Sequence, residues 1–217
     1  MPEPVALYGI LTLLAAGSAA AHIRAEYRGP RWVVYACKPL TTSLLLLLAC
    51  SPGAAGDRYA LAIVTGLTLS LAGDVFLMLP RDRFVAGLVS FLLAHVAYLI
   101  AFTAGVSFAG APVVFVPYAA VGVVVLAILW RDLGRLRGPV TLYVVVIMAM
   151  ASQAVARALA LQTTAAILAA AGAALFVASD TILAFDRFRQ RFRSARLLVL
   201  VTYVLAQWLI ALSVAMA

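Results

Sequence analysis

The chain has 217 residues, of which 66% are hydrophobic and only 11% are charged, and its mean hydropathy is +1.10. A soluble domain cannot cover so much apolar surface with so few polar groups, so the composition excludes a soluble globular protein and indicates an integral membrane protein. The net charge of +8 does not indicate a nucleic-acid partner, because most of the basic residues lie in the loops between the apolar segments, where such residues determine membrane topology.

Eight apolar segments are long enough, at about 20 residues each, to cross a bilayer core as helices. In chain order they are residues 5–21, 33–50, 59–79, 83–104, 112–130, 139–157, 162–185 and 194–215. The second and sixth are the weakest, because Lys38 interrupts one and Gln153 with Arg157 interrupts the other, so six or seven full spans are an alternative. The first segment lacks a basic leader and a small-residue cleavage site, so we interpret it as a retained helix. With short loops and no linker, the sequence predicts an all-α, multi-pass bundle that forms one domain over residues 1–217.

The basic residues predict the orientation of this bundle. Of the 16 lysines and arginines, Lys38 lies within a span and Arg58 and Arg157 belong to the even-numbered loops, which leaves 13 in the odd-numbered loops. These are Arg24, Arg28, Arg31, Arg81, Arg83, Arg131, Arg135, Arg137, Arg187, Arg189, Arg191, Arg193 and Arg196. Because basic loops stay in the cytoplasm, both termini are predicted on the non-cytoplasmic side. The loop over 187–196 would also suit anionic lipid headgroups, although a plain topology signal is the preferred interpretation.

Two of the helices end in similar sequences. The third ends in GDVFLMLPRDRF (73–84) and the seventh in SDTILAFDRF (179–188). Because the two helices are four apart, one interpretation is a parallel 4+4 internal repeat, and the other is chance similarity between apolar segments. Either interpretation predicts that Asp74 and Asp180 lie at equivalent depths.

Several polar residues are predicted to form one layer within the bundle. An aspartate inside an apolar span costs about 2.5–3.5 kcal/mol, so Asp74 and Asp180 are expected to have a use. Counted at 1.5 Å per residue, both lie about five residues from the cytoplasmic ends of their helices, and Lys38 lies at the same depth. Tyr203 is about one turn deeper. Such a layer predicts a cavity that opens to the cytoplasm.

Structural roles are the alternative for some of these groups. His95 and Gln207 lie nearer the bilayer centre, where His95 could be a core histidine and Gln207, with Tyr203, could join helices by hydrogen bonds. Lys38 could extend to the membrane interface. The two aspartates are harder to explain, because Lys38 balances only one carboxylate. We expect the other carboxyl to carry a proton near neutral pH, an arrangement that general acid catalysis uses.

The sequence offers little that would hold a metal or a cofactor, and we expect neither. It has two histidines, so it cannot form a three-histidine zinc site, and it contains no His-Glu-x-x-His motif. A mixed site of two aspartates and one histidine remains as an alternative. A Gly-x-Ser-x-Gly elbow and a phosphate-binding loop are also absent from the sequence, which gives no support to a serine hydrolase or a nucleotide enzyme.

Five ordered motifs run from the second predicted helix to the eighth. They are CKPLTT (37–42), GDVFLML (73–79), FVAGLVSFLLAHVAYLIAF (84–102), LFVASDTILAFDRF (175–188) and YVLAQWLIA (203–211). Together they resemble the YhhN family of membrane proteins, which includes the lysoplasmalogenases. The resemblance implies a hydrolase that cleaves the vinyl ether bond of a lysophospholipid and releases a fatty aldehyde and a glycerophospho head group.

The resemblance also implies roles for the polar layer. An enol ether is cleaved by protonation of its β-carbon, and water then captures the oxocarbenium ion, so Asp74 and Asp180 would supply an acid and a carboxylate in either order. Lys38 would bind the phosphate or tune the two carboxyls. The water and the glycerol hydroxyl would be held by His95, Tyr98, Tyr203 and Gln207. A composition rich in Ala, Val, Leu and Arg suggests a bacterial chain in the inner or plasma membrane. Because many bacteria do not make plasmalogens, another lysolipid is the alternative for the physiological substrate.

A proton-coupled transporter of a small or lipid-like substrate is the alternative function. Carboxylates, a lysine and a histidine at one depth also describe such carriers. Carriers of this kind contain paired helix breaks near the middle of the membrane, whereas the internal prolines of this chain are expected near helix ends. These prolines are Pro39, Pro80, Pro112, Pro117 and Pro139. The sequence does not predict the oligomeric state.

Overall fold

The computed structural model describes residues 3–50, 57–80, 83–107 and 112–217. Within these residues the chain forms eight α-helices and no strand, so the predicted all-α bundle is confirmed. The helices are α1 (Glu3–Arg28), α2 (Arg31–Ala49), α3 (Arg58–Met78), α4 (Phe84–Phe102), α5 (Pro112–Leu129), α6 (Arg137–Leu161), α7 (Thr164–Phe188) and α8 (Ala195–Ala215). A short 3₁₀ helix, Gly134–Leu136, precedes α6.

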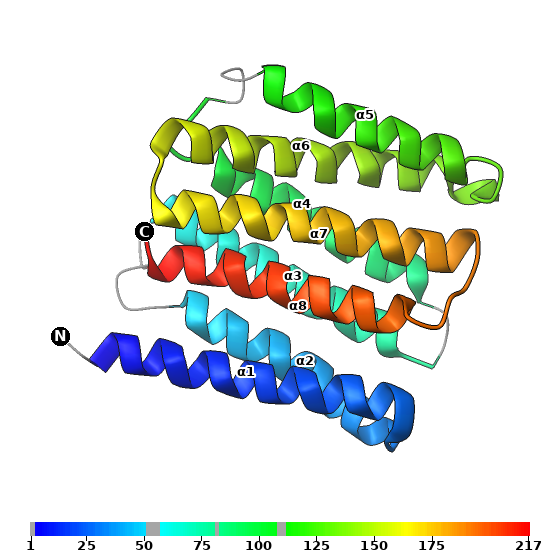
Figure 1. The fold of residues 1–217 in the computed structure, drawn as a ribbon, viewed down its shortest axis with the longest axis horizontal. Coiled ribbons are helices and arrows are strands. Elements are labelled where there is room, and N and C mark those ends of the chain that lie inside the picture. Colours follow the sequence, from blue (N-terminus) through cyan, green and yellow to red (C-terminus); the bar gives the residue numbers. More distant parts are fainter. Residues whose placement is uncertain (1–2, 51–56, 81–82, 108–111) are drawn as a thin grey trace.

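The helices pack side by side and alternate in direction along the chain (Figure 1). The closest partners are α3 with α4 and α7 with α8, while α5 lies at one edge of the bundle against α6. As a result α1 begins and α8 ends at the same end, and the loop between α7 and α8 lies at the opposite end (Figure 1). This placement agrees with termini that share one side of a membrane; which side that is, and whether the two halves are a repeat, stay predictions.

Cysteine labelling would decide the orientation. In a chain whose two native cysteines are replaced, we expect Asp57→Cys to react with a membrane-impermeant thiol reagent added to intact cells, because the loop before α3 is predicted outside. Arg189→Cys, at the end of α7, should react only after lysis. Labelling in the reverse pattern would contradict the predicted orientation. Arg81, one of the basic residues behind the prediction, lies outside the described residues.

Seven of the described helices are long and apolar enough to cross a membrane, and the shorter one is Val113–Leu129 of α5. The alternative of seven full spans fits this count, but the helix left out is neither α2 nor α6.

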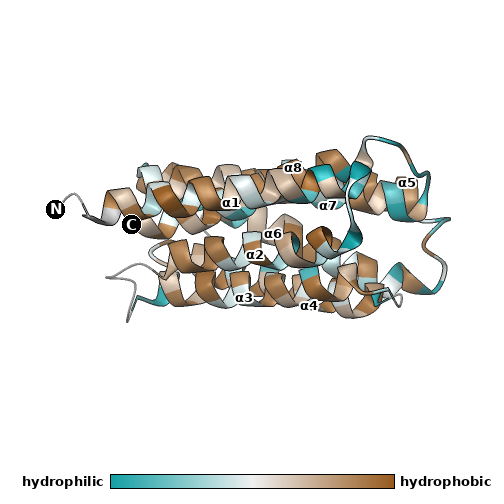
Figure 2. Cartoon of the chain, turned by 90° about the horizontal axis from the view of Figure 1, so that it is seen from below, coloured by the Kyte–Doolittle hydropathy of each residue, from teal (hydrophilic) through white to brown (hydrophobic). Residues whose placement is uncertain are grey.

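The polar residues of α6 bind the end of α4. Gln153 of α6 donates to the carbonyls of Phe102 and Val106 at 3.2 and 3.3 Å, and Arg157 donates to the carbonyl of Ala104 at 3.2 Å. These carbonyls lie at the end of α4 and in the turn that follows it, where the helix offers no donor, so the side chains of Gln153 and Arg157 have partners inside the bundle. Figure 2 shows the apolar character of most helical surfaces.

Two prolines depart from their expected places near helix ends. Pro39 lies inside α2, which begins at Arg31, and Pro117 lies inside α5, which begins at Pro112. A proline removes one backbone donor from the helix, which membrane helices tolerate when neighbouring groups compensate. The two helices do not occupy corresponding positions in the two halves of the chain. The paired breaks typical of carriers are therefore not formed by these two prolines.

The contact between α7 and α8 depends on Gly172. A Cβ atom at this position would lie 2.8 Å from the carbonyl oxygen of Ala206 and 2.8 Å from Cγ1 of Ile210. We expect Gly172→Ala to lower the free energy of unfolding by about 1–3 kcal/mol, because the backbones must separate to admit the methyl group. Thermal unfolding in detergent measures this, with Gly138→Ala as the control, since a Cβ there meets nothing within 4 Å. Equal stability of the two variants would show that the helices are not in close contact at Gly172.

Candidate active site

Asp74 is buried in α3, with 2% of its surface exposed, and is surrounded by hydrogen-bond donors. Lys38 Nζ, from α2, lies 3.3 Å from its Oδ1 atom. The hydroxyls of Thr42 and Tyr203 donate to its Oδ2 atom at 2.7 and 2.6 Å. Lys38 and Thr42 are four residues apart and therefore share one face of α2. An ionised carboxylate accepts hydrogen bonds and cannot donate them, so this environment suits a charged Asp74 paired with Lys38.

A chain of hydrogen bonds behind Asp74 fixes the orientation of Tyr203. Gln207 Nε2 donates to the Tyr203 hydroxyl at 3.2 Å, and Gln207 Oε1 accepts from the Tyr98 hydroxyl at 2.7 Å. The Ser70 hydroxyl lies 3.5 Å from that of Tyr98. Tyr98 and Gln207 have no exposed surface. The bond between them joins α4 to α8, which is the structural role that the sequence left open for Gln207.

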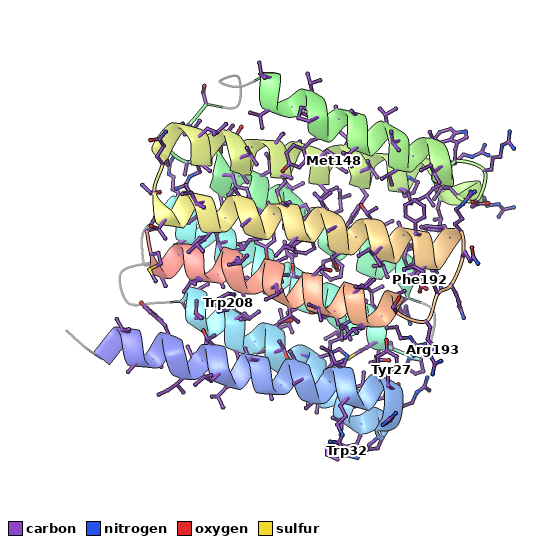
Figure 3. The ribbon with its side chains drawn as sticks, viewed as in Figure 1. Tyr27, Trp32, Met148, Phe192, Arg193 and Trp208 are labelled. Atoms are coloured by element: carbon purple, nitrogen blue, oxygen red, sulfur yellow. The ribbon has the colours of Figure 1, made fainter. Side chains whose placement is uncertain are left out.

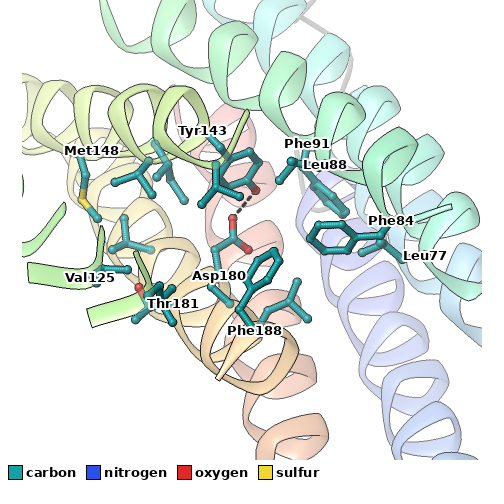
Figure 4. Close-up of a pocket in the computed structure, with 17 residues that line it drawn as sticks. Leu77, Phe84, Leu88, Phe91, Val125, Tyr143, Met148, Asp180, Thr181 and Phe188 are labelled. Carbon is teal, nitrogen blue, oxygen red and sulfur yellow. Dashed lines mark hydrogen bonds between the residues drawn. The ribbon is translucent and has the colours of Figure 1, made fainter. Parts of the chain in front are cut away.

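Asp180 lies on α7 in a different environment. The hydroxyl of Tyr143, from α6, donates to its Oδ2 atom, as the dashed line in Figure 4 shows. His95 Nε2, from α4, is 3.8 Å from the same oxygen. The Asp180 side chain is 15% exposed, whereas His95 is sealed from the surface. The His95 ring packs edge-on against Phe176, with ring centroids 4.6 Å apart.

Both aspartates line one large cavity, which we call the polar cavity. Its volume is about 860 Å³, and its wall includes Lys38, Asp74, Asp180 and Tyr203. Its mouth is lined by arginines from the basic loops and helix ends: Arg83, Arg187, Arg191, Arg193 and Arg196. The predicted cavity at the end of the bundle that carries the basic loops is thus present. His95, Tyr98 and Gln207 are absent from this wall and lie behind it.

The α7–α8 loop at the mouth is attached to α1. The Tyr27 hydroxyl donates to the carbonyl oxygen of Arg193 at 3.3 Å and accepts from the backbone N–H of Leu197 at 3.2 Å. Figure 3 shows Tyr27 and Arg193 together at this end of the bundle. Arg196 also lies 3.4 Å from Glu26. These contacts hold the mouth of the polar cavity between α1 and the start of α8.

Comparison with known proteins identifies the family. The sequence profile of the YhhN family matches residues 33–214. The chain belongs to the YhhN family. The membrane protein YhhN of Escherichia coli O157:H7 is 32% identical over 194 residues, which are 88% of this chain and 91% of the relative. Lysoplasmalogenase TMEM86B of Rattus norvegicus is 32% identical over 208 residues, covering 85% of this chain and 74% of the relative. Lysoplasmalogenase TMEM86A of Bos taurus is 33% identical over 195 residues, covering 85% and 79%. No solved structure matches the chain.

In this YhhN protein, the five sequence motifs meet at the polar cavity or directly behind it. CKPLTT supplies Lys38, GDVFLML supplies Asp74 and LFVASDTILAFDRF supplies Asp180. Tyr143 lies outside these motifs and was not among the predicted site residues. It lies about six residues into its helix from the basic end, close to the depth predicted for Lys38, so its depth is the signal in the sequence that could have identified it.

Within the described part of the chain, no three side chains of the types His, Cys, Asp and Glu come together in a way that could hold a metal ion. The mixed site of two aspartates and a histidine is not assembled there, because His95 accompanies Asp180 while Lys38 occupies the place beside Asp74.

Proposed function

We propose that this YhhN protein is a membrane-embedded hydrolase that cleaves the vinyl ether bond of lysoplasmalogens by carboxyl-based general acid catalysis. The observation that carries the proposal is the presence of two carboxyls from different helices, Asp74 and Asp180, on the wall of one cavity. Two relatives named lysoplasmalogenase, each about one-third identical to this chain, support the hydrolase class.

The reaction needs an acid, a negative charge and one water molecule. The acid protonates the β-carbon of the enol ether, and the oxocarbenium ion that results is stabilised by a nearby carboxylate until water captures it. Asp74 and Asp180 supply these two functions, and a cavity of about 860 Å³ admits both water and the polar part of a lysolipid. Glycoside hydrolysis uses the same pair of groups for a similar cation.

The mouth of the polar cavity suits an anionic head group. Its five arginines outnumber the two acidic side chains away from the aspartate pair, Glu26 and Asp186, and Glu26 already pairs with Arg196. The remaining positive charge attracts the phosphate of a lysophospholipid and binds it through hydrogen bonds. Lys38 contacts Asp74 directly, so its first role is to hold that carboxylate. Tyr203 and Tyr143 each orient one aspartate through a hydroxyl. Tyr98 and Gln207 act as positioning residues behind Tyr203.

Aldehyde release by the purified protein tests the proposal. Solubilised in detergent and given a 1-alkenyl lysophospholipid, the protein should release fatty aldehyde. The 1-alkyl ether of the same chain length is the control, because it has no double bond to protonate and should remain intact. A transporter would release nothing in detergent, where no second compartment exists. Absence of aldehyde from a folded protein would therefore overturn the hydrolase and favour the transporter.

A further inference from the structure

A second, smaller cavity meets the polar cavity at Asp180. This cavity, which we call the apolar pocket, has a volume of about 70 Å³ and lies among side chains of α3, α4, α5, α6 and α7. Figure 4 shows the Asp180 carboxyl directed into it among aliphatic and aromatic side chains. The residues that line both cavities are Leu77, Phe84, Phe91, Asp180 and Leu183. Asp180 therefore lies at the boundary between a polar and an apolar space.

The apolar pocket suits a hydrocarbon chain better than water. Water in a protein cavity needs two to four polar partners, and Asp180, Tyr143 and Thr181 are the polar side chains among those that line this pocket. At about 15 Å³ for each water-sized group, the volume admits on the order of five carbon-sized groups. The side chains that α5 contributes to the pocket, Val125 and Leu129, are both apolar.

A 1-alkenyl lysolipid has the same two parts as this pair of cavities. Its vinyl ether joins the hydrocarbon chain to the glycerol, so the β-carbon that accepts the proton belongs to the chain and the ether oxygen begins the polar part. With the chain in the apolar pocket and the head group toward the arginines, the reacting bond lies beside Asp180. Asp74 lines only the polar cavity.

The partners of the two aspartates also differ in charge. Asp74 has Lys38 at 3.3 Å, whereas among the ion pairs of the described residues Asp180 has only His95, at 3.8 Å. Both ring nitrogens of His95 are buried without a hydrogen-bond partner. A charged imidazolium carries two N–H donors, and at Nδ1 one of them would be left unsatisfied, so the site favours a neutral His95. Asp180 accepts one hydrogen bond, from the Tyr143 hydroxyl, which favours the ionised form, but it has no charged partner of the kind that Lys38 provides for Asp74. Beside an apolar wall, the missing counter-charge outweighs that single hydrogen bond and favours the protonated form.

We propose, building on the hydrolase function, that the apolar pocket binds the alkenyl chain and that Asp180 is the proton donor, while Asp74 stays ionised beside Lys38. The Asp180 proton moves to the β-carbon, where the π electrons of the double bond form the new C–H bond. Water attacks the α-carbon of the oxocarbenium ion and returns a proton to Asp180. The hemiacetal then collapses: its hydroxyl proton moves to the glycerol oxygen as the C–O bond breaks, which gives the aldehyde and the alcohol.

Substitutions that fill the apolar pocket test its occupant. Val144, on α6, and Val177, on α7, line it and are buried. We expect Val144→Phe and Val177→Phe each to lower kcat/KM at least about tenfold for a hexadecenyl lysophospholipid, but less than about threefold for the propenyl analogue, which has only one carbon beyond the reacting pair. The control is Val145→Phe, because Val145 is the next residue on α6 and is 54% exposed; both substrates should react as with the wild type.

Two results would overturn the chain site while leaving the hydrolase intact: an equal loss for long and short substrates in both filled variants, or an equal loss in Val145→Phe. If the wild type cleaves neither substrate, the hydrolase itself fails.

Infrared spectra of the wild type and of each Asn variant, compared as difference spectra at neutral pH, show which aspartate carries a proton and need no turnover. The carbonyl band of a protonated carboxyl should be present in the wild type and in Asp74→Asn, and lost in Asp180→Asn. The opposite pattern, or a band that survives in Asp180→Asn, would overturn the assignment of Asp180 as the donor.

Discussion

Replacement of either aspartate by asparagine is expected to lower kcat at least about 100-fold without preventing folding, the lower scale for an acid–base group. Asparagine keeps the size and most hydrogen bonds of aspartate, so a packing or hydrogen-bonding role would survive the change. The ion pair of Asp74 with Lys38 would not survive it, so Asp74→Asn should be the less stable of the two variants. Asp74→Asn still accepts from the hydroxyls of Thr42 and Tyr203, and Asp180→Asn still accepts from Tyr143. The amide, however, can neither donate a proton to carbon nor stabilise a cation with negative charge.

The double variant should be hardly slower than either single variant, because groups that act as a unit are not additive. Asp132→Asn is the matched control. This aspartate pairs with Arg189 near the surface, 3.3 Å away, and does not line the polar cavity, so the variant should keep wild-type kcat. A folded Asp74→Asn or Asp180→Asn protein that retains most of its activity would refute the mechanism with two carboxyls.

Removal of Lys38 is expected to have the second largest effect, on stability as well as activity. Lys38→Met leaves the Asp74 carboxylate buried without its cation, and breaking a buried ion pair from one side costs roughly 3–5 kcal/mol. The double variant Lys38→Met with Asp74→Asn removes both charges, so it should recover most of the lost stability but none of the activity. Thermal unfolding in detergent and aldehyde release measure the two effects.

Arg58→Met is the control for the loss of a positive charge, because Arg58 lies at the start of α3, at the other end from the mouth of the polar cavity. If Lys38→Met were as stable as the wild type and only raised KM, Lys38 would bind the phosphate of the substrate rather than Asp74.

Hydropathy and charge were sufficient to predict the helices and the depth of the polar residues. Lys38 and Asp74 were placed in one layer by counting residues, and the structure brings them within 3.3 Å. Counting works because the rise of a helix is fixed at 1.5 Å per residue. It cannot give the direction in which a side chain points around its helix, which depends on the neighbouring helices.

The predictions that the structure corrects failed because they depended on the direction of side chains around their helices. Gln153 and Arg157 appeared to weaken the sixth span, yet they bond to carbonyls near the end of α4. Of the four residues expected to hold the water and the glycerol hydroxyl, only Tyr203 lines the polar cavity, whereas His95, Tyr98 and Gln207 lie behind its wall. Tyr143 was overlooked, since a tyrosine near a membrane interface is common and gives no signal of its own. Each of these outcomes depends on which helices are neighbours, and a single sequence does not predict the contacts between helices.

Hydrolysis in heavy water tests the central claim most directly. If a carboxyl in exchange with solvent protonates the β-carbon, the purified protein in D₂O should convert 1-alkenyl lysophospholipid to an aldehyde that carries one deuterium on the carbon next to the carbonyl. The aldehyde is reduced as it forms, so that later exchange adds no label, and mass spectrometry counts the deuterium. An aldehyde without deuterium would contradict proton transfer to carbon, and with it the proposed catalytic use of Asp74 and Asp180.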